Sequence, residues 1–143
     1  MSELTFDAVK AAVLEAGFEV LRAKGETIQL AERVRSHLMD AGVSVQVADA
    51  LQVSVVVRSQ RSDFPAASTE EIFHKVRHAV DPVAHAHGFL ESSSQSRQLH
   101  DPGDSAHVLD VWYELTYTKP CSDLAALVLD LQWALSLPKC VTQ

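Results

Sequence analysis

Four side chains of metal-binding type recur on one predicted helix in the middle of the chain. The stretch Ser68-Thr69-Glu70-Glu71 has the form of a capping box and predicts that a helix begins there. At 100° per residue, the following ligand types fall on one face of this helix: His74, His78, Asp81 and His85. Histidines four residues apart can converge on one ion, and imidazole with carboxylate suits zinc or nickel. We expect a solvated, histidine-rich helix face, and a zinc or nickel site is the alternative.

A second candidate for chemistry is Cys121, which lies where the last predicted helix begins. Backbone N–H groups at a helix start lower a thiol pKa, but a nucleophilic cysteine also needs a histidine as base. His100 and His107 lie on the preceding segment, but no pattern in the sequence indicates that either is close enough to Cys121 to act as its base. It also has no Gly-rich phosphate loop and no GxSxG, HExxH or CxxC motif. We therefore predict no catalytic residue, and no bound cofactor unless the histidine face holds a metal.

Large apolar side chains form the third group. Trp112 shares a predicted strand face with acidic and threonine side chains, which is unusual for tryptophan and typical of an anchor for a partner. The alternative is that a helix covers it. The last predicted helix, Asp123 to about Ser136, is apolar nearly all round, with Leu129 and Trp133 on a side of their own. Trp112, Leu129 and Trp133 are therefore the predicted partner-binding residues.

The overall charge limits the class of partner. Of 143 residues, 12 are Lys or Arg and 19 are Asp or Glu, which gives a net charge of −7. A basic surface for nucleic acid or an anionic membrane is not expected from such a chain. The two cysteines, Cys121 and Cys140, flank a predicted helix that holds them beyond disulfide reach. The longest apolar run contains Asp130 and is too short to span a bilayer. These features predict a cytoplasmic protein.

Two helical patterns are predicted to fill the first part of the chain. Apolar residues recur at steps of three and four from Phe6 to Ala23, and again from Ile28 to Leu38. Gly25 favours a break between two helices, although one continuous helix over 5–41 remains an alternative. Residues 1–42 are therefore predicted to form a helical N-terminal segment.

The rest of the chain, residues 43–143, predicts a body of sheet and helices. Alternating apolar residues predict two strands from Val43 to Val57, joined near 48–50, and a second hairpin of Phe89–His100 with His107–Lys119. The order α-α-β-β-α-β-β-α predicts a single α+β domain over 1–143. About four antiparallel strands in two hairpins are expected, with helices on one face. In architecture alone, this order is similar to those of small secretion chaperones and phage tail-assembly proteins.

The apolar helix surface exceeds what a four-stranded sheet can cover. The sequence therefore predicts a non-enzymatic protein-interaction module of chaperone, immunity or assembly-factor type. It is expected to act as a homodimer and to bind another protein. The alternative is a metal-binding protein or metal-dependent enzyme that uses the histidine face.

Overall fold

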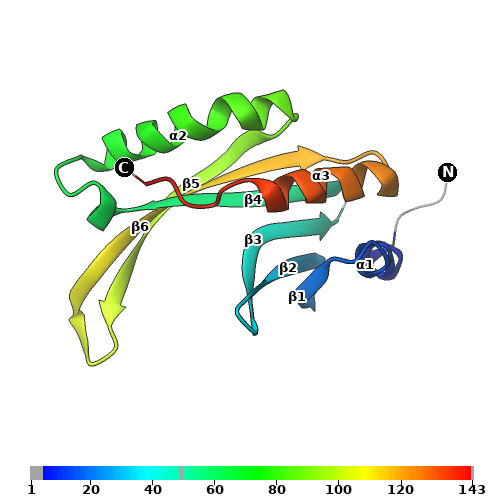
Figure 1. Ribbon diagram of the computed structural model, residues 1–143, viewed down its shortest axis with the longest axis horizontal. Helices are drawn as coiled ribbons and strands as arrows, with labels where there is room; N and C mark the ends of the chain where they lie inside the picture. Colours follow the sequence, from blue (N-terminus) through cyan, green and yellow to red (C-terminus); the bar gives the residue numbers. More distant parts are fainter. Residues whose placement is uncertain (1–4, 49, 143) are drawn as a thin grey trace. The chain divides into compact units, whose positions relative to one another are not determined.

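The computed structural model describes residues 5–48 and 50–142, in which one helix precedes four strands, a second helix precedes two strands, and a third helix follows (Figure 1). The helices are α1 (Phe6–Glu15), α2 (Thr69–Ala86) and α3 (Leu124–Ser136), with a short 3-10 turn at Arg61–Asp63. The strands are β1 (Glu19–Lys24), β2 (Thr27–Val34), β3 (His37–Val47), β4 (Leu51–Gln60), β5 (Leu90–Asp101) and β6 (Asp104–Pro120). The predicted α+β class is confirmed.

The six strands form one antiparallel sheet in the order β1-β2-β3-β4-β6-β5. The chain divides into two compact units, and β4 and β6 contribute residues to both. Unit 1 consists of Met1–Val55 with Thr118–Leu137, and unit 2 of Val56–Tyr117 with Pro138–Gln143. The expectation of a single domain over 1–143 stays a prediction.

The prediction of a helical segment over residues 1–42 is wrong beyond the first helix. Only Phe6–Glu15 is helical in its described part, and the chain then enters the three strands β1, β2 and β3. Gly17 and Gly25 have positive φ angles of 93° and 64°, a conformation that ends the helix at the first position and turns β1 into β2 at the second. The sheet therefore has six strands instead of about four, and neither one helix nor two spans 5–41.

A β-bulge explains why β2 has a helical appearance in the sequence. The pairing of β2 with β3 shifts register between Gln29 and Ala31. Ile28, Leu30 and Ala31 are consequently all buried, although a regular strand would turn two adjacent residues to opposite faces. Ile28 and Ala31 are thus both buried three residues apart, a step that is also typical of an apolar helix face, so periodicity alone suggested the wrong element.

Unit 1 has its core where α1 and α3 pack on the strands. α1 contacts both α3 and β1, and α3 contacts β3. The fully buried side chains of this core come from all of these layers: Val9, Val13, Ile28, Leu30, Val45, Val53, Val55, Leu127 and Leu131. This apolar layer fixes the orientation of α3 and therefore decides which α3 residues stay exposed.

Unit 2 has α2 packed along the sheet. The capping box predicted at Ser68 is present, with the Ser68 hydroxyl accepting from the Glu71 N–H, and Pro82 lies inside the helix without ending it. Ile72, Val76, Val80 and Ala84 face inward and are buried, as are the β6 residues Tyr113, Leu115 and Tyr117. β5 is the last strand in the sheet order and therefore forms an edge of the sheet.

None of the helices in the described part of the chain combines the length and the apolar character needed to cross a bilayer.

Candidate functional site

Trp112 lies between two arginines on the strands of unit 2. The Arg58 Cζ of β4 is 4.2 Å from the centroid of the Trp112 ring, and the Arg97 Cζ of β5 is 5.5 Å from it. Because Tyr113 and Leu115 point into the core, the alternation of β6 turns Trp112 and Glu114 to the opposite face. Guanidinium groups over an indole form favourable cation–π contacts. We call Arg58, Gln95, Arg97, Trp112 and Glu114 the Trp112 surface.

The charges of the Trp112 surface leave one arginine uncompensated. Arg97 Nη2 lies 3.1 Å from Glu114 Oε1, and Gln95 Nε2 donates to the same oxygen at 3.3 Å. The Glu114 side chain is only 9% exposed, so these contacts offset the loss of its hydration. Arg58, by contrast, makes no ion pair with any carboxylate in the described part of the chain. The surface thus carries a net positive charge in a chain whose total is −7.

The half-buried Trp112 contacts both arginines through its ring and not through its Nε1–H group. Its Nε1–H group is buried and has no hydrogen-bond partner among residues 5–48 and 50–142. Asp110, which the sequence places on the same strand face, instead accepts from the Ser62 backbone N–H at 3.1 Å and the Ser62 hydroxyl at 2.6 Å. Two guanidinium groups therefore lie against the tryptophan ring, although its strand sequence suggested acidic neighbours.

On α3, the predicted contact residues Leu129 and Trp133 lie one turn apart in unit 1. Leu129 is 66% exposed, which makes it the most exposed of the large apolar side chains in the described chain. Trp133 is half-buried. Leu127 and Leu131, by contrast, are fully buried in the unit 1 core. We call Leu129 and Trp133 the α3 face.

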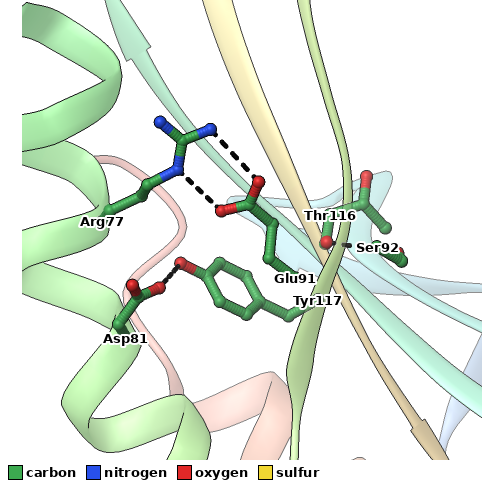
Figure 2. A network of polar contacts seen from close by, with 6 residues as sticks. All are labelled: Arg77, Asp81, Glu91, Ser92, Thr116 and Tyr117. Atoms are coloured by element: carbon green, nitrogen blue, oxygen red, sulfur yellow. Dashed lines mark hydrogen bonds and ion pairs between the residues drawn. The ribbon is translucent and has the colours of Figure 1, made fainter.

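The four predicted metal ligands on α2 do not share one environment. His74 and His78 are exposed and their rings stack with centroids 6.3 Å apart. Asp81 is half-buried and points to the sheet, where its carboxylate accepts a hydrogen bond from the Tyr117 hydroxyl (Figure 2). His85 is exposed in the last turn of the helix. Within residues 5–48 and 50–142, no group of three or more His, Cys, Asp or Glu side chains is placed to hold a metal ion.

Asp81 belongs to a polar network that ties α2 to β5 and β6. Figure 2 shows the Arg77 guanidinium facing the Glu91 carboxylate one helical turn away from the Asp81–Tyr117 contact, and Arg77 Nε and Nη2 donate to Glu91 at 2.7 and 3.1 Å. Burial raises the pKa of Tyr117, and the hydrogen bond to Asp81 raises it further. The phenol therefore stays protonated and donates throughout the neutral range. This network positions α2, and within it the Asp81 carboxylate is bonded to Tyr117.

Cys121 lies in a chemical environment that suppresses a nucleophile. Burial raises the pKa of the thiol to about 12, and the Asp130 carboxylate that accepts from Sγ at 3.2 Å contributes to the increase. Lys119 Nζ pairs with the other Asp130 oxygen at 2.9 Å. A thiol with this pKa is overwhelmingly protonated near pH 7, so the helix start does not activate it as sequence position suggested.

Sequence reasoning missed Arg58 and Arg97 as partners of Trp112. Each is a single cation in a strand, and nothing local links either to residue 112. The signal that could have found Arg97 is the pairing of consecutive strands in a hairpin, which brings β5 side chains beside β6. Arg58 could not be found in this way, because β4 and β6 are neighbours in the sheet but are separated in the sequence by α2 and β5.

The chain was compared with protein-family models, with curated proteins and with solved structures, and it matches none of them.

Proposed function

We propose that this chain is a non-enzymatic protein-interaction module that binds an acidic segment of another protein at the Trp112 surface. The observation that carries the proposal is the stack of Arg58, Trp112 and Arg97, in which Arg58 has no carboxylate partner within the described residues. Tryptophan and arginine are the residue types that contribute most to protein interfaces, since they combine large contact area with specific polar contacts. A chaperone, immunity protein or assembly factor would use such a surface.

The charge of this surface favours an acidic partner segment. A guanidinium group binds a carboxylate through two parallel hydrogen bonds, and the Arg58 fork is not used in this way by the described chain. The rest of the protein is acidic and repels such a segment elsewhere, which favours one site over others. We therefore expect the partner to present Asp or Glu beside an apolar side chain that covers the Trp112 ring.

We further propose that the module acts as a homodimer through the α3 face. A leucine that is 66% exposed, with a tryptophan on the next turn, is an unusual surface for a helix whose Leu127 and Leu131 are fully buried in a core. Contact between two copies would remove this apolar area from water. The high pKa of Cys121 argues against a thiol-dependent enzyme as an alternative.

Selection from a displayed peptide library tests the acidic partner. Peptides enriched on the native chain are expected to carry Asp or Glu next to an apolar residue and to lose most of their binding to Arg58→Gln and Arg97→Gln. The matched control is Arg22→Gln, which removes the same charge from an exposed position on β1 and should leave binding unchanged. Enrichment without acidic residues, or equal losses in all three variants, would contradict the proposal.

Native mass spectrometry of the untagged chain tests the dimer and the metal alternative together. A metal-free dimer that dissociates in Leu129→Glu supports the α3 face as the contact. A monomer at all concentrations contradicts the dimer. A stoichiometric zinc or nickel ion that is lost in His74→Ala and His78→Ala would instead favour the metal-binding alternative.

A further inference from the structure

The last described residues lie along β4 in unit 2 as a short added strand, and we call them the 138–142 segment. Arg58 N donates to the Lys139 carbonyl at 2.8 Å, and the Arg58 carbonyl accepts from Val141 N at 2.9 Å. Arg58 and Cys140 therefore form a parallel bridge, and Figure 1 shows this last part of the chain running beside β4.

The 138–142 segment extends the face of the sheet that carries Trp112. Residues that lie opposite each other in a bridge turn their side chains to the same face, so Cys140 shares the face of Arg58. The Arg58 guanidinium lies over the Trp112 ring on this face, and Cys140 is exposed there. Cys140 therefore borders the Trp112 surface on the β4 side.

Four side chains on four neighbouring strands consequently form a row across this face. The N–H and C=O groups of one strand residue point to the same side, so the segment occupies one edge of β4 at Arg58 and β6 lies on the other. The row consists of Cys140, Arg58 on β4, Trp112 on β6 and Arg97 on β5. At the usual spacing between neighbouring strands the row is roughly 14 Å long. An extended chain of about five residues covers this distance.

Arg58 is the member of the row that can bind a new carboxylate. Arg97 is already paired with Glu114 at 3.1 Å, whereas Arg58 makes no ion pair with a carboxylate of the described chain. The Trp112 ring covers one side of the Arg58 guanidinium, and the neighbour of Arg58 on the other strand edge is Cys140. Cysteine is small and brings no carboxylate to the guanidinium. The charge of Arg58 is therefore not neutralised from either neighbouring strand.

We propose that the acidic segment of the partner lies across the strands along this row, with a carboxylate bound by Arg58 beside Cys140 and an apolar side chain over Trp112. The inference rests on the proposed function and adds the 138–142 segment to its binding site. Charge favours an acidic occupant, because the two guanidinium groups of the row pair with a single carboxylate of the described chain, that of Glu114. The partner then ends its contact at the 138–142 segment and not at β4.

A change of charge at position 140 tests whether the partner reaches this end of the row. The probe is the acidic peptide most enriched on the native chain, synthesised with a fluorescent label, and its affinity is measured by fluorescence anisotropy. Cys140→Glu places a carboxylate beside Arg58, where it competes for the guanidinium and repels the peptide, and should weaken binding by about tenfold. Cys140→Gln is the matched control, because it has nearly the same shape without the charge, and should bind like the native chain.

Two further comparisons make the test specific. In an Arg58→Gln background the ratio of affinities between Cys140→Gln and Cys140→Glu should shrink to about threefold, because competition for the guanidinium is gone and only repulsion remains. Ala79→Glu adds the same charge at an exposed position on α2, which packs on the other face of the sheet, and should leave the affinity nearly unchanged. Circular dichroism confirms that all variants fold.

Equal affinities of Cys140→Glu and Cys140→Gln, for a peptide that still depends on Arg58 and Arg97, overturn this inference and leave the proposed function intact. Equal losses in Cys140→Glu and Ala79→Glu overturn it as well, because they indicate only long-range repulsion. If the native chain enriches no acidic peptide, the proposed function and this inference both fail. A dimer that Cys140→Glu weakens while peptide affinity stays unchanged would place a second copy of the chain on the row, which also overturns the inference.

Discussion

Removing the Tyr117 hydroxyl tests whether Asp81 serves the fold or the exposed helix face. In Tyr117→Phe, the buried ring stays and the Asp81 carboxylate loses its donor. A hydrogen bond to a charged group contributes about 1.5–3 kcal/mol, so the free energy of unfolding should fall by that amount. For a chain of this length the midpoint of thermal unfolding should then fall by roughly 5–10 °C.

The assay is urea unfolding followed by circular dichroism, arranged as a double-mutant cycle. Asp81→Asn and Tyr117→Phe should each destabilise, and the double variant should lose less than the sum, with a coupling of about 1 kcal/mol or more. His78→Ala is the control on the same helix. It removes an exposed side chain and should change stability by no more than about 0.5 kcal/mol.

Tyr117→Phe should also change the pH dependence of stability at alkaline pH. Because the pKa of Tyr117 is raised in the folded protein, the protonated phenol is favoured by folding. Its contribution is complete below the ordinary tyrosine pKa of about 10 and is lost as the pH rises above it. The free energy of unfolding of Tyr117→Phe should therefore fall less steeply at alkaline pH than that of the native chain. The comparison is best made in a Cys121→Ser background, because the pKa of the Cys121 thiol is also raised and would add its own pH dependence. Additive losses in the cycle, with an unchanged alkaline profile, would refute the anchoring role.

The remaining predictions concern one thiol, one carboxylate and one pair of leucines. Cys121 should react with iodoacetamide far more slowly than an unfolded cysteine at pH 8, and Asp130→Asn should accelerate it by lowering the thiol pKa; an unchanged rate would contradict the contact. Burial raises the pKa of Asp110, but its hydrogen bonds outweigh this effect and hold the pKa below its usual range. Asp110→Asn should therefore reduce the loss of stability that the protein suffers below about pH 4, as measured by urea unfolding at several pH values. Leu131→Ala should cost about 2–5 kcal/mol, whereas Leu129→Ala should cost less than about 1 kcal/mol in dilute monomer, and similar losses for both would show that α3 is oriented differently.

The second half of the fold was largely accessible from the sequence because its signals are local. The capping box at Ser68 and the alternation that predicts the hairpin of Phe89–His100 with His107–Lys119 each depend on neighbouring residues, and the structure contains the predicted elements. The first half was not accessible, since the bulge after Gln29 buries both Ile28 and Ala31, whose three-residue separation is also a step along a helix face. Only pairing with β3 resolves that ambiguity, and pairing is not visible in a single segment.

The candidate site was predictable only as far as single residues. Trp112 stood out by its type on a polar strand face, but its stacking with Arg58 depends on which strands become neighbours. Asp81 has the helical phase of the histidines, yet its carboxylate reaches Tyr117 on a strand thirty-six residues away. Spacing in the sequence gives the positions of residues around a helix axis, but it does not show which other elements pack against each side of that helix.

The division of the chain into units has a consequence for synthesis on the ribosome. Unit 1 draws on Met1–Val55 and on Thr118–Leu137, so the residues between them are made before the unit can close. Val9 and Val13 of α1 share their core with Leu127 and Leu131, which leave the ribosome more than a hundred residues later. Until then α1 and the first strands lack their covering helix, and their apolar faces remain open to water. Native folding of unit 1 is therefore postponed until α3 has been made, and the nascent chain depends on slow, long-range closure.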